Sequence, residues 1–177
     1  MQISHRDAAE ALHDVEKTAA RSAKLRLYER GAPHFILWGI LWAAGYGLTY
    51  AVPQHAWTVW LVIDAAGLGG SAYLARDRLR LWRVAATAAT LFLFFFAAFA
   101  MLGPLSGLQI GAFIPLTVAC AYILAGLRAG SRFAAAGAVI AAVTLAGFFF
   151  LPAHFLLWMA IAGGGAMVSA GLWLRRV

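Results

Sequence analysis

One stretch limits this chain to a single class of protein: WTVWLVIDAAGLGGSAYLARDRLRLWR, residues 57–83. Asp64 is the only charged residue between Trp57 and Leu74, and that segment nearly spans a bilayer core at about 1.5 Å per residue. Four arginines follow it, at positions 76, 78, 80 and 83. Because short arginine-rich loops stay on the cytoplasmic side, the stretch predicts a transmembrane helix that runs from outside to inside.

The rest of the chain has the same character. Of its 177 residues, 63% are hydrophobic and only 12% are charged, a balance unlike that of a soluble domain. Six apolar spans follow one another with short turns, at residues 34–52, 57–74, 84–102, 108–127, 133–151 and 153–174. We therefore predict an all-α fold: a polytopic bundle of six transmembrane helices in residues 34–177, preceded by a cytoplasmic helix in residues 1–33.

The 14 lysines and arginines give a second constraint. Six precede the first span, four and two lie in the loops after the second and fourth spans, and two end the chain. The turns near Pro53, Pro104 and Pro152 hold none. This distribution predicts that both termini are cytoplasmic, in a bacterial inner (plasma) membrane. The cations lie at span ends, so we expect contact with anionic lipid headgroups and no binding of nucleic acid.

The turn prolines recur at nearly constant intervals of 51 and 48 residues. Arg76, Arg128 and Arg175 close the three units. An even number of crossings per unit leaves all units in the same orientation, which predicts three helical hairpin repeats. The alternative is that any six-helix protein with short turns shows a rough period.

The segment before the first span carries six cations and a weak apolar stripe. We predict a helix from about His5 to Glu29, which Gly31 ends, and a new helix that begins near Pro33. The stripe consists of Ala8, Leu12, Val15, Ala19 and Ala23. Such a helix rests on the lipid surface or pairs with a protein partner or a second copy of the chain; the alternative is a solvated helix without a partner.

Small residues recur every four positions in three of the spans, and in lipid such stripes mark close helix contacts. They are Gly39, Ala43 and Gly47 in the first span, Ala134, Ala138, Ala142 and Ala146 in the fifth, and Ala162, Ala166 and Ala170 in the sixth.

Asp64 is the strongest candidate for a functional residue. A carboxyl group near mid-membrane must be protonated, hydrogen-bonded or in contact with water. Folding the first hairpin at its turn makes Tyr46 the nearest hydroxyl, with Thr49 and Tyr50 nearer the outer surface. Two interpretations stay open: a proton- or ion-linked site, and a neutral acid whose hydrogen bond joins two helices.

Pro115 predicts a kink in the fourth span, because proline cannot donate to the carbonyl of Gly111. A carbonyl freed in this way can line a site. We find no Ser/His/Asp set, no paired carboxylates, no phosphate-binding glycine loop and no metal-ligand cluster in the sequence. We therefore expect no enzymatic activity, no cofactor and no metal.

The first hairpin combines glycines in its first helix, a turn proline (Pro53) and an acid in its second helix (Asp64). With three hairpins, it resembles the HdeD-type six-helix bacterial inner-membrane proteins. The resemblance covers mainly residues 35–78, and Val52 and Ala65 depart from the family pattern. The glycines that carry it are Gly39, Gly45 and Gly47.

The resemblance implies a link with acid stress. We therefore expect a small accessory or stress-related membrane protein that acts through helix packing and its N-terminal helix. The alternative is a transporter or channel-like protein that uses Asp64.

Overall fold

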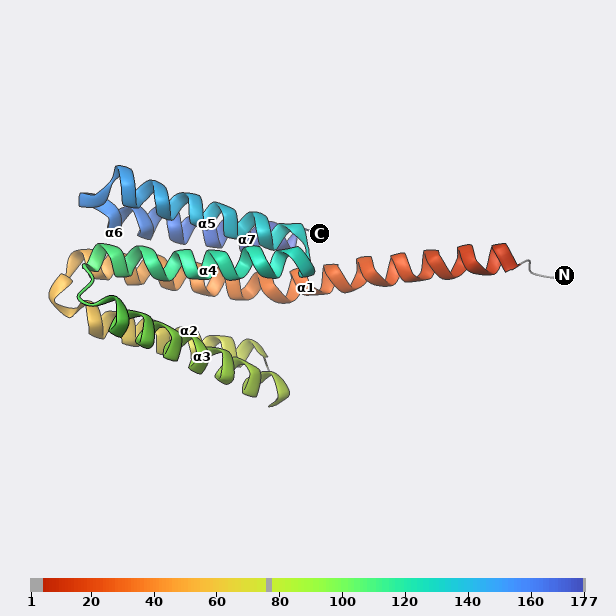
Figure 1. The fold of residues 1–177 in the computed structure, drawn as a ribbon, viewed down its shortest axis with the longest axis horizontal. Coiled ribbons are helices and arrows are strands. Elements are labelled where there is room, and N and C mark those ends of the chain that lie inside the picture. Colours follow the sequence, from red (N-terminus) through yellow and green to blue (C-terminus); the bar gives the residue numbers. More distant parts are fainter. Residues whose placement is uncertain (1–4, 76–77, 177) are drawn as a thin grey trace.

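The computed structural model describes residues 5–75 and 78–176, and these form helices joined by short turns (Figure 1). Arg76 and Asp77, where the predicted basic loop begins, lie outside them. The all-α prediction is confirmed. The elements are α1 (His5–Ala51), η1 (Pro53–His55), α2 (Ala56–Ala75), α3 (Arg78–Leu102), α4 (Gly107–Ala129), α5 (Ser131–Phe150), η2 (Pro152–His154), α6 (Phe155–Trp158), η3 (Met159–Gly163) and α7 (Gly164–Arg175).

Four segments of the described chain are long and apolar enough to cross a membrane. They lie in α3, in α4, in α5, and in the run from Pro152 to Arg175, where the π-helical turn η3 joins α6 to α7. α1 and α2 are not among these four. Tryptophan, tyrosine and glycine lower the mean hydropathy of both helices, and α2 also carries Asp64.

Two pairs of helices are in close backbone contact: α1 with α7, and α4 with α5. A Cβ added at Gly164 of α7 would lie 2.8 Å from the carbonyl oxygen of Gly39 in α1. A Cβ added at Gly137 of α5 would lie 2.6 Å from the carbonyl oxygen of Ala119 in α4. Because real Cβ atoms do not approach oxygen so closely, each pair depends on glycine at its contact.

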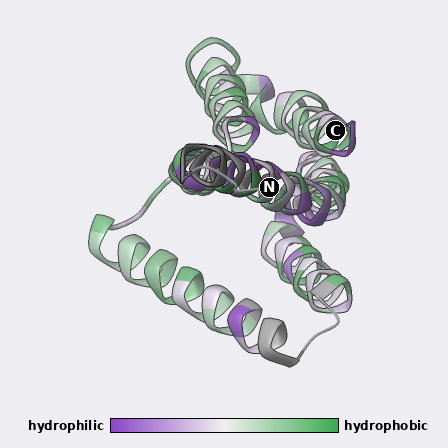
Figure 2. Ribbon diagram, turned by 90° about the vertical axis from the view of Figure 1, so that its right-hand side faces the viewer, coloured by the Kyte–Doolittle hydropathy of each residue, from purple (hydrophilic) through white to green (hydrophobic). Residues whose placement is uncertain are grey.

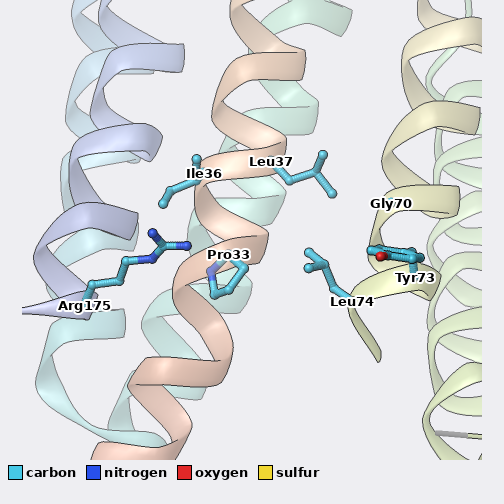
Figure 3. Close-up of a pocket in the computed structure, with 7 residues that line it drawn as sticks. All are labelled: Pro33, Ile36, Leu37, Gly70, Tyr73, Leu74 and Arg175. Carbon is cyan, nitrogen blue, oxygen red and sulfur yellow. The ribbon is translucent and has the colours of Figure 1, made fainter. Parts of the chain in front are cut away.

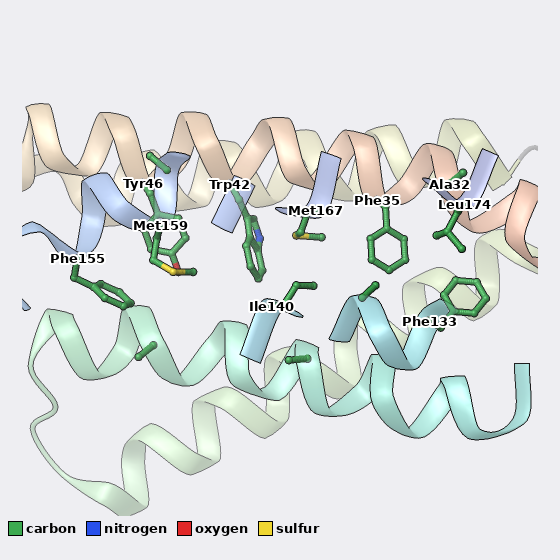
Figure 4. Packing of buried hydrophobic residues seen from close by; sticks show 14 of the residues in the cluster. Ala32, Phe35, Trp42, Tyr46, Phe133, Ile140, Phe155, Met159, Met167 and Leu174 are labelled. Carbon is green, nitrogen blue, oxygen red and sulfur yellow. The ribbon is translucent and has the colours of Figure 1, made fainter. Parts of the chain in front are cut away.

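An aromatic layer separates the two pairs. The rings of Phe35 in α1 and Tyr122 in α4 lie 4.4 Å apart between centroids. Phe133 of α5 packs 6.1 Å from Phe35 (Figure 4). The residues that α1 buries toward its neighbours follow a regular 4-3 spacing, which keeps one side of a helix facing its partners. They are Tyr28, Ala32, Phe35, Gly39, Trp42, Tyr46 and Thr49.

α3 is set apart from the other helices (Figure 2). None of its membrane-length window from Ala85 to Leu102 is buried. Phe94, Phe95 and Phe99 contact the ring of Phe113 in α4, with centroid distances of 5.9 to 6.5 Å. Other bulky side chains that the structure describes in this helix, such as Phe92 and Phe96, are exposed, as expected for a lipid-facing helix.

The predicted helix break at Gly31 and Pro33 is wrong, because α1 continues through both residues. Gly31 packs against the ring of Phe133, and Ala32 is completely buried. Pro33 has no backbone N–H, so the carbonyl of Glu29 loses its hydrogen bond within the helix. Glu29 is exposed, and water can donate to its carbonyl instead. Packing on both sides of the two residues therefore overrides their local tendency to end a helix.

The predicted small-residue stripes are correct in the first span and only partly correct in the fifth and the sixth. Gly39 and Ala43 of the first span do contact α7, through Gly164. In the fifth span Ala134 packs against Gly126 of α4, whereas Ala138 and Ala142 are exposed. In the sixth span the predicted alanines are only partly buried, and it is Gly164 and Gly171 that approach α1.

The glycine contact between α1 and α7 can be tested at two adjacent positions. Gly164→Val should lower the free energy of unfolding by about 1–3 kcal/mol, because the added atoms have no room beside Gly39. Gly165→Val is the matched control, since a Cβ there meets no atom within 4 Å. Thermal unfolding in detergent measures the difference; equal midpoints for the two variants would contradict this packing.

Candidate functional site

The structure places Tyr46 at the centre of the bundle, where only 2% of it is exposed. Its hydroxyl donates a 2.7 Å hydrogen bond to the carbonyl oxygen of Gly111 in α4. This bond crosses from the α1–α7 pair to the α4–α5 pair. It is therefore a polar link between the pairs, like the 2.8 Å bond from Trp158 Nε1 in α6 to the Val143 carbonyl in α5.

Pro115 explains why the Gly111 carbonyl can accept this bond. In an undisturbed helix the N–H of residue 115 would donate to that carbonyl, but proline has no N–H. Pro115 is buried inside α4, so water cannot easily replace the missing donor. Tyr46 supplies it instead. Both residues were predicted as site members, but the sequence did not predict that they serve the same carbonyl.

Aromatic rings surround the Tyr46 side chain. Trp60 of α2 lies edge-on to it with a centroid distance of 4.9 Å, and Trp42 and Phe155 lie at 6.2 and 6.4 Å. Gly45 allows the close approach of Trp60, because a Cβ there would lie 3.1 Å from the indole ring. Figure 4 shows Tyr46 beside Phe155 and Met159. Rings from three spans thus meet around one hydroxyl.

Asp64 does not take the predicted place beside Tyr46. Trp60, one turn earlier in α2, occupies it, because the bulky indole fits against Gly45 and the Tyr46 ring. Asp64 is exposed on α2, and no hydrogen bond or ion pair joins it to any other residue that the structure describes. The candidate set is therefore spread over two environments.

The other two predicted members also separate. Thr49 is buried and donates its hydroxyl to the carbonyl of Gly45 in its own helix, at 2.7 Å. Tyr50 is 49% exposed. Thr49 therefore belongs with the Tyr46 cluster, whereas Tyr50 faces outward.

The sequence did not reveal the π-helical turn η3 (Met159–Gly163), which lies next to this cluster. Met159 is completely buried there. Such turns often mark functional positions, because they shift the helix register and disturb its hydrogen bonding. The only sequence signal was the run Gly163-Gly164-Gly165, which indicated packing and carried no sign of an irregular turn.

The cluster has the chemistry of a structural polar link. Among the described side chains, every buried nitrogen and oxygen has a hydrogen-bond partner. Among the described residues, no three His, Cys, Asp or Glu side chains lie close enough together to hold a metal ion. Tyr46 is thus already committed to a carbonyl, and the carboxyl group of Asp64 lies at the surface of the bundle. The chain matches no protein-family model, no curated protein and no solved structure.

A double-mutant cycle tests the link between Tyr46 and Pro115. Tyr46→Phe should lower the free energy of unfolding by about 1 kcal/mol, because it leaves the buried Gly111 carbonyl without a donor. In a Pro115→Ala background the restored backbone N–H can serve that carbonyl, so the same change should cost less than half as much. Tyr50→Phe, at an exposed position, is the control. Equal costs for Tyr46→Phe in both backgrounds would show that the two residues act independently.

Proposed function

We propose that this protein is a small, non-enzymatic integral membrane protein that holds a rigid cytoplasmic helix for a partner protein. The observation that carries the proposal is the continuity of α1 from His5 to Ala51. Its last part belongs to the bundle, and its first part extends beyond the bundle along the same axis (Figure 1). A bundle with this appended helix fits an accessory, stress-related role better than a catalytic one.

A six-span arrangement is part of the proposal. Besides the four strongly apolar segments, α2 has 20 residues and the packed part of α1 has a similar length, enough for two more crossings. The three proline turns lie at one end of the bundle in Figure 1, and the ends that carry Arg128, Arg132 and Arg175 lie at the other. By the positive-inside rule, the arginine end and both termini face the cytoplasm of a bacterial inner membrane.

Two of the three hairpin turns support the repeat. Val52 before η1 has φ −133° and ψ 65°, and Leu151 before η2 has φ −132° and ψ 45°. Each turn then reads Pro-x-His and closes with a bond from the histidine N–H to the residue before the proline. The middle turn differs: it uses Gly103 at φ 78° and a capping box between Ser106 and Gln109. The first and last hairpins are therefore the units most alike.

The extension of α1 is suited to a protein partner. From Leu12 to Arg26 every described side chain but Ser22 and Leu25 is exposed, so the helix leaves the bundle without folding back. About 20 residues project, which is roughly 30 Å. A helix coaxial with a membrane span points away from the bilayer, so it cannot rest flat on the lipid surface. Its apolar stripe at Leu12 and Val15, 61% and 64% exposed, is then available for a partner helix.

The topology can be tested with introduced cysteines. Cysteines at Gln54 and Ser106 should react with an impermeant thiol reagent added outside the cell, because both residues lie in turns that hold no cation. A cysteine at Arg128 should react only after the membrane is opened. Labelling at Arg128 from outside would overturn the proposed orientation; Cys120 is first replaced by alanine in all variants.

The partner surface can be tested by photo-crosslinking in intact membranes. A photoreactive residue at Leu12 or Val15 should give a discrete protein adduct, whereas one at Lys17, on the other side of the helix, should not. Leu12→Asp with Val15→Asp should remove the adduct from neighbouring positions at equal protein level. Adducts with lipid alone at Leu12 and Val15 would reject the protein partner, and an adduct with a second copy would identify the partner as the same chain.

An ion-linked function at Asp64 is the second candidate. It is favoured by the lack of a hydrogen bond from this carboxyl group to any described residue, because an intramembrane acid without a fixed partner is available to bind an ion or a proton. In that case Asp64→Asn must abolish function as completely as Asp64→Leu, since an amide does not titrate. Under the main proposal, Asp64→Asn leaves the thermal midpoint and the crosslinks at Leu12 unchanged. A normal cellular phenotype of Asp64→Asn at equal protein level would exclude the ion-linked alternative.

A further inference from the structure

A groove of about 290 Å³ lies at the arginine end of the bundle, on the outer side of α1 (Figure 3). α2 borders it on one side and α7 on the other. Its walls are almost entirely apolar, apart from the hydroxyl of Tyr73 and one guanidinium group. The residues that define it are Pro33, Ile36 and Leu37 of α1, Gly70 and Leu74 of α2, and Arg175 of α7.

Contacts on both sides of α1 explain why the groove is open between its neighbours. Ile36 packs against Gly171 of α7, where an added Cβ would lie 2.6 Å from the isoleucine side chain. Leu37 packs against Gly70 of α2, where the corresponding distance is 2.8 Å. α7 and α2 therefore pack against adjacent sides of α1, and the surface of α1 between these two contacts is left as an uncovered strip.

The uncovered strip continues along α1 toward the proline turns. Ile40 is seven residues after Pro33 and thus on the same side of the helix, and it is 57% exposed. Leu48, eleven residues after Leu37, is 49% exposed. In a membrane this apolar strip is the size and shape of the path that an acyl chain follows along a helix.

Positive charge surrounds the end of the groove. Arg175 stands in the last turn of α7 and lines the groove itself. Arg26 and Arg30 are exposed and lie seven residues before Pro33 and Leu37, so they continue the same side of α1 beyond the groove. Glu29 is the acid nearest to them in α1. Among the residues that the structure describes, three arginines against one glutamate leave this end of the groove cationic.

We propose that the groove binds an anionic phospholipid, with an acyl chain along Leu37 and Ile40 and the phosphate group beside Arg175. The occupant must be amphiphilic, because the groove is apolar along its length and cationic at one end only. That end coincides with the end of the apolar helices, the depth at which phosphate groups of a bilayer lie. This inference does not rest on the proposed partner, since the α1 residues that line the groove begin at Pro33, 18 residues after Val15 of the projecting stripe.

The full-length protein in detergent gives a direct test. Phosphatidylglycerol should raise the thermal midpoint and appear as a bound adduct in native mass spectrometry, whereas phosphatidylcholine should bind more weakly and glycerol phosphate, which has no acyl chain, should not bind. Arg175→Gln should weaken phosphatidylglycerol binding about fivefold, the effect of one cation near a lipid phosphate. Arg128→Gln is the matched control, because Arg128 is also exposed and lies in the last turn of α4, at the arginine end of the bundle.

A pair of glycine variants tests the apolar part. Gly70→Leu places a side chain against Leu37 and fills the groove, so it should abolish the adduct. Gly69→Leu adds the same atoms where a Cβ meets nothing within 4 Å, and it should bind as the parent does. Circular dichroism confirms that each variant is folded. Equal binding by Gly70→Leu and Gly69→Leu, equal losses for Arg175→Gln and Arg128→Gln, or binding of glycerol phosphate alone would each overturn the proposal.

Discussion

Close backbone contact at glycine is the interaction on which the rest of this bundle depends. Lipid tails are as apolar as leucine, so no hydrophobic force drives two membrane helices together, and contact at short range must hold them. Gly39 and Gly164 provide it between α1 and α7, and Ala119 and Gly137 provide it between α4 and α5. These two pairs then act as units. The space between the two pairs is wider, and aromatic side chains fill it. The helices are therefore in backbone contact within each pair and are separated by large side chains between the pairs.

Two hydrogen bonds give the contact between the pairs a direction: Tyr46 donates to the Gly111 carbonyl, and the indole N–H of Trp158 in α6 donates to the Val143 carbonyl in α5. Proline in a helix normally weakens it, but here Pro115 creates the acceptor that a neighbouring helix needs. A hydrogen bond of this kind fixes the relative position of the two pairs along their axes, because sliding by one turn would leave both groups without a partner. α3 has no equivalent bond to the described helices, and its phenylalanine rings contact Phe113 of α4, which is consistent with its outlying position.

The continuity of α1 connects the bundle to the segment that projects beyond it (Figure 1). The same helix that carries Tyr46 in the bundle carries Leu12 and Val15 beyond it, without a flexible joint. A tilt or rotation of α1 in the bundle would therefore be transmitted to its projecting end, and a partner bound there would be held at a fixed angle. The groove between α2 and α7 lies on this same helix. A lipid bound beside Arg175 would thus contact the element that links the bundle to its projecting end.

The sequence alone determined that the chain is helical throughout and where the proline turns lie. The turns at Pro53 and Pro152, and the glycine stripe of the first span, follow from local chemistry: proline, glycine and charge act within a few residues of where they stand. Tertiary structure decided which residues meet. Because of tertiary packing, α1 continues through Gly31 and Pro33, and Trp60 rather than Asp64 lies beside Tyr46. Tyr46 donates to the carbonyl that Pro115 leaves without a donor. Ala138 and Ala142 are exposed. The physical reason is that spans which are apolar on every side carry little periodic signal, so the register and the contact face of each helix depend on how its shape fits a neighbour.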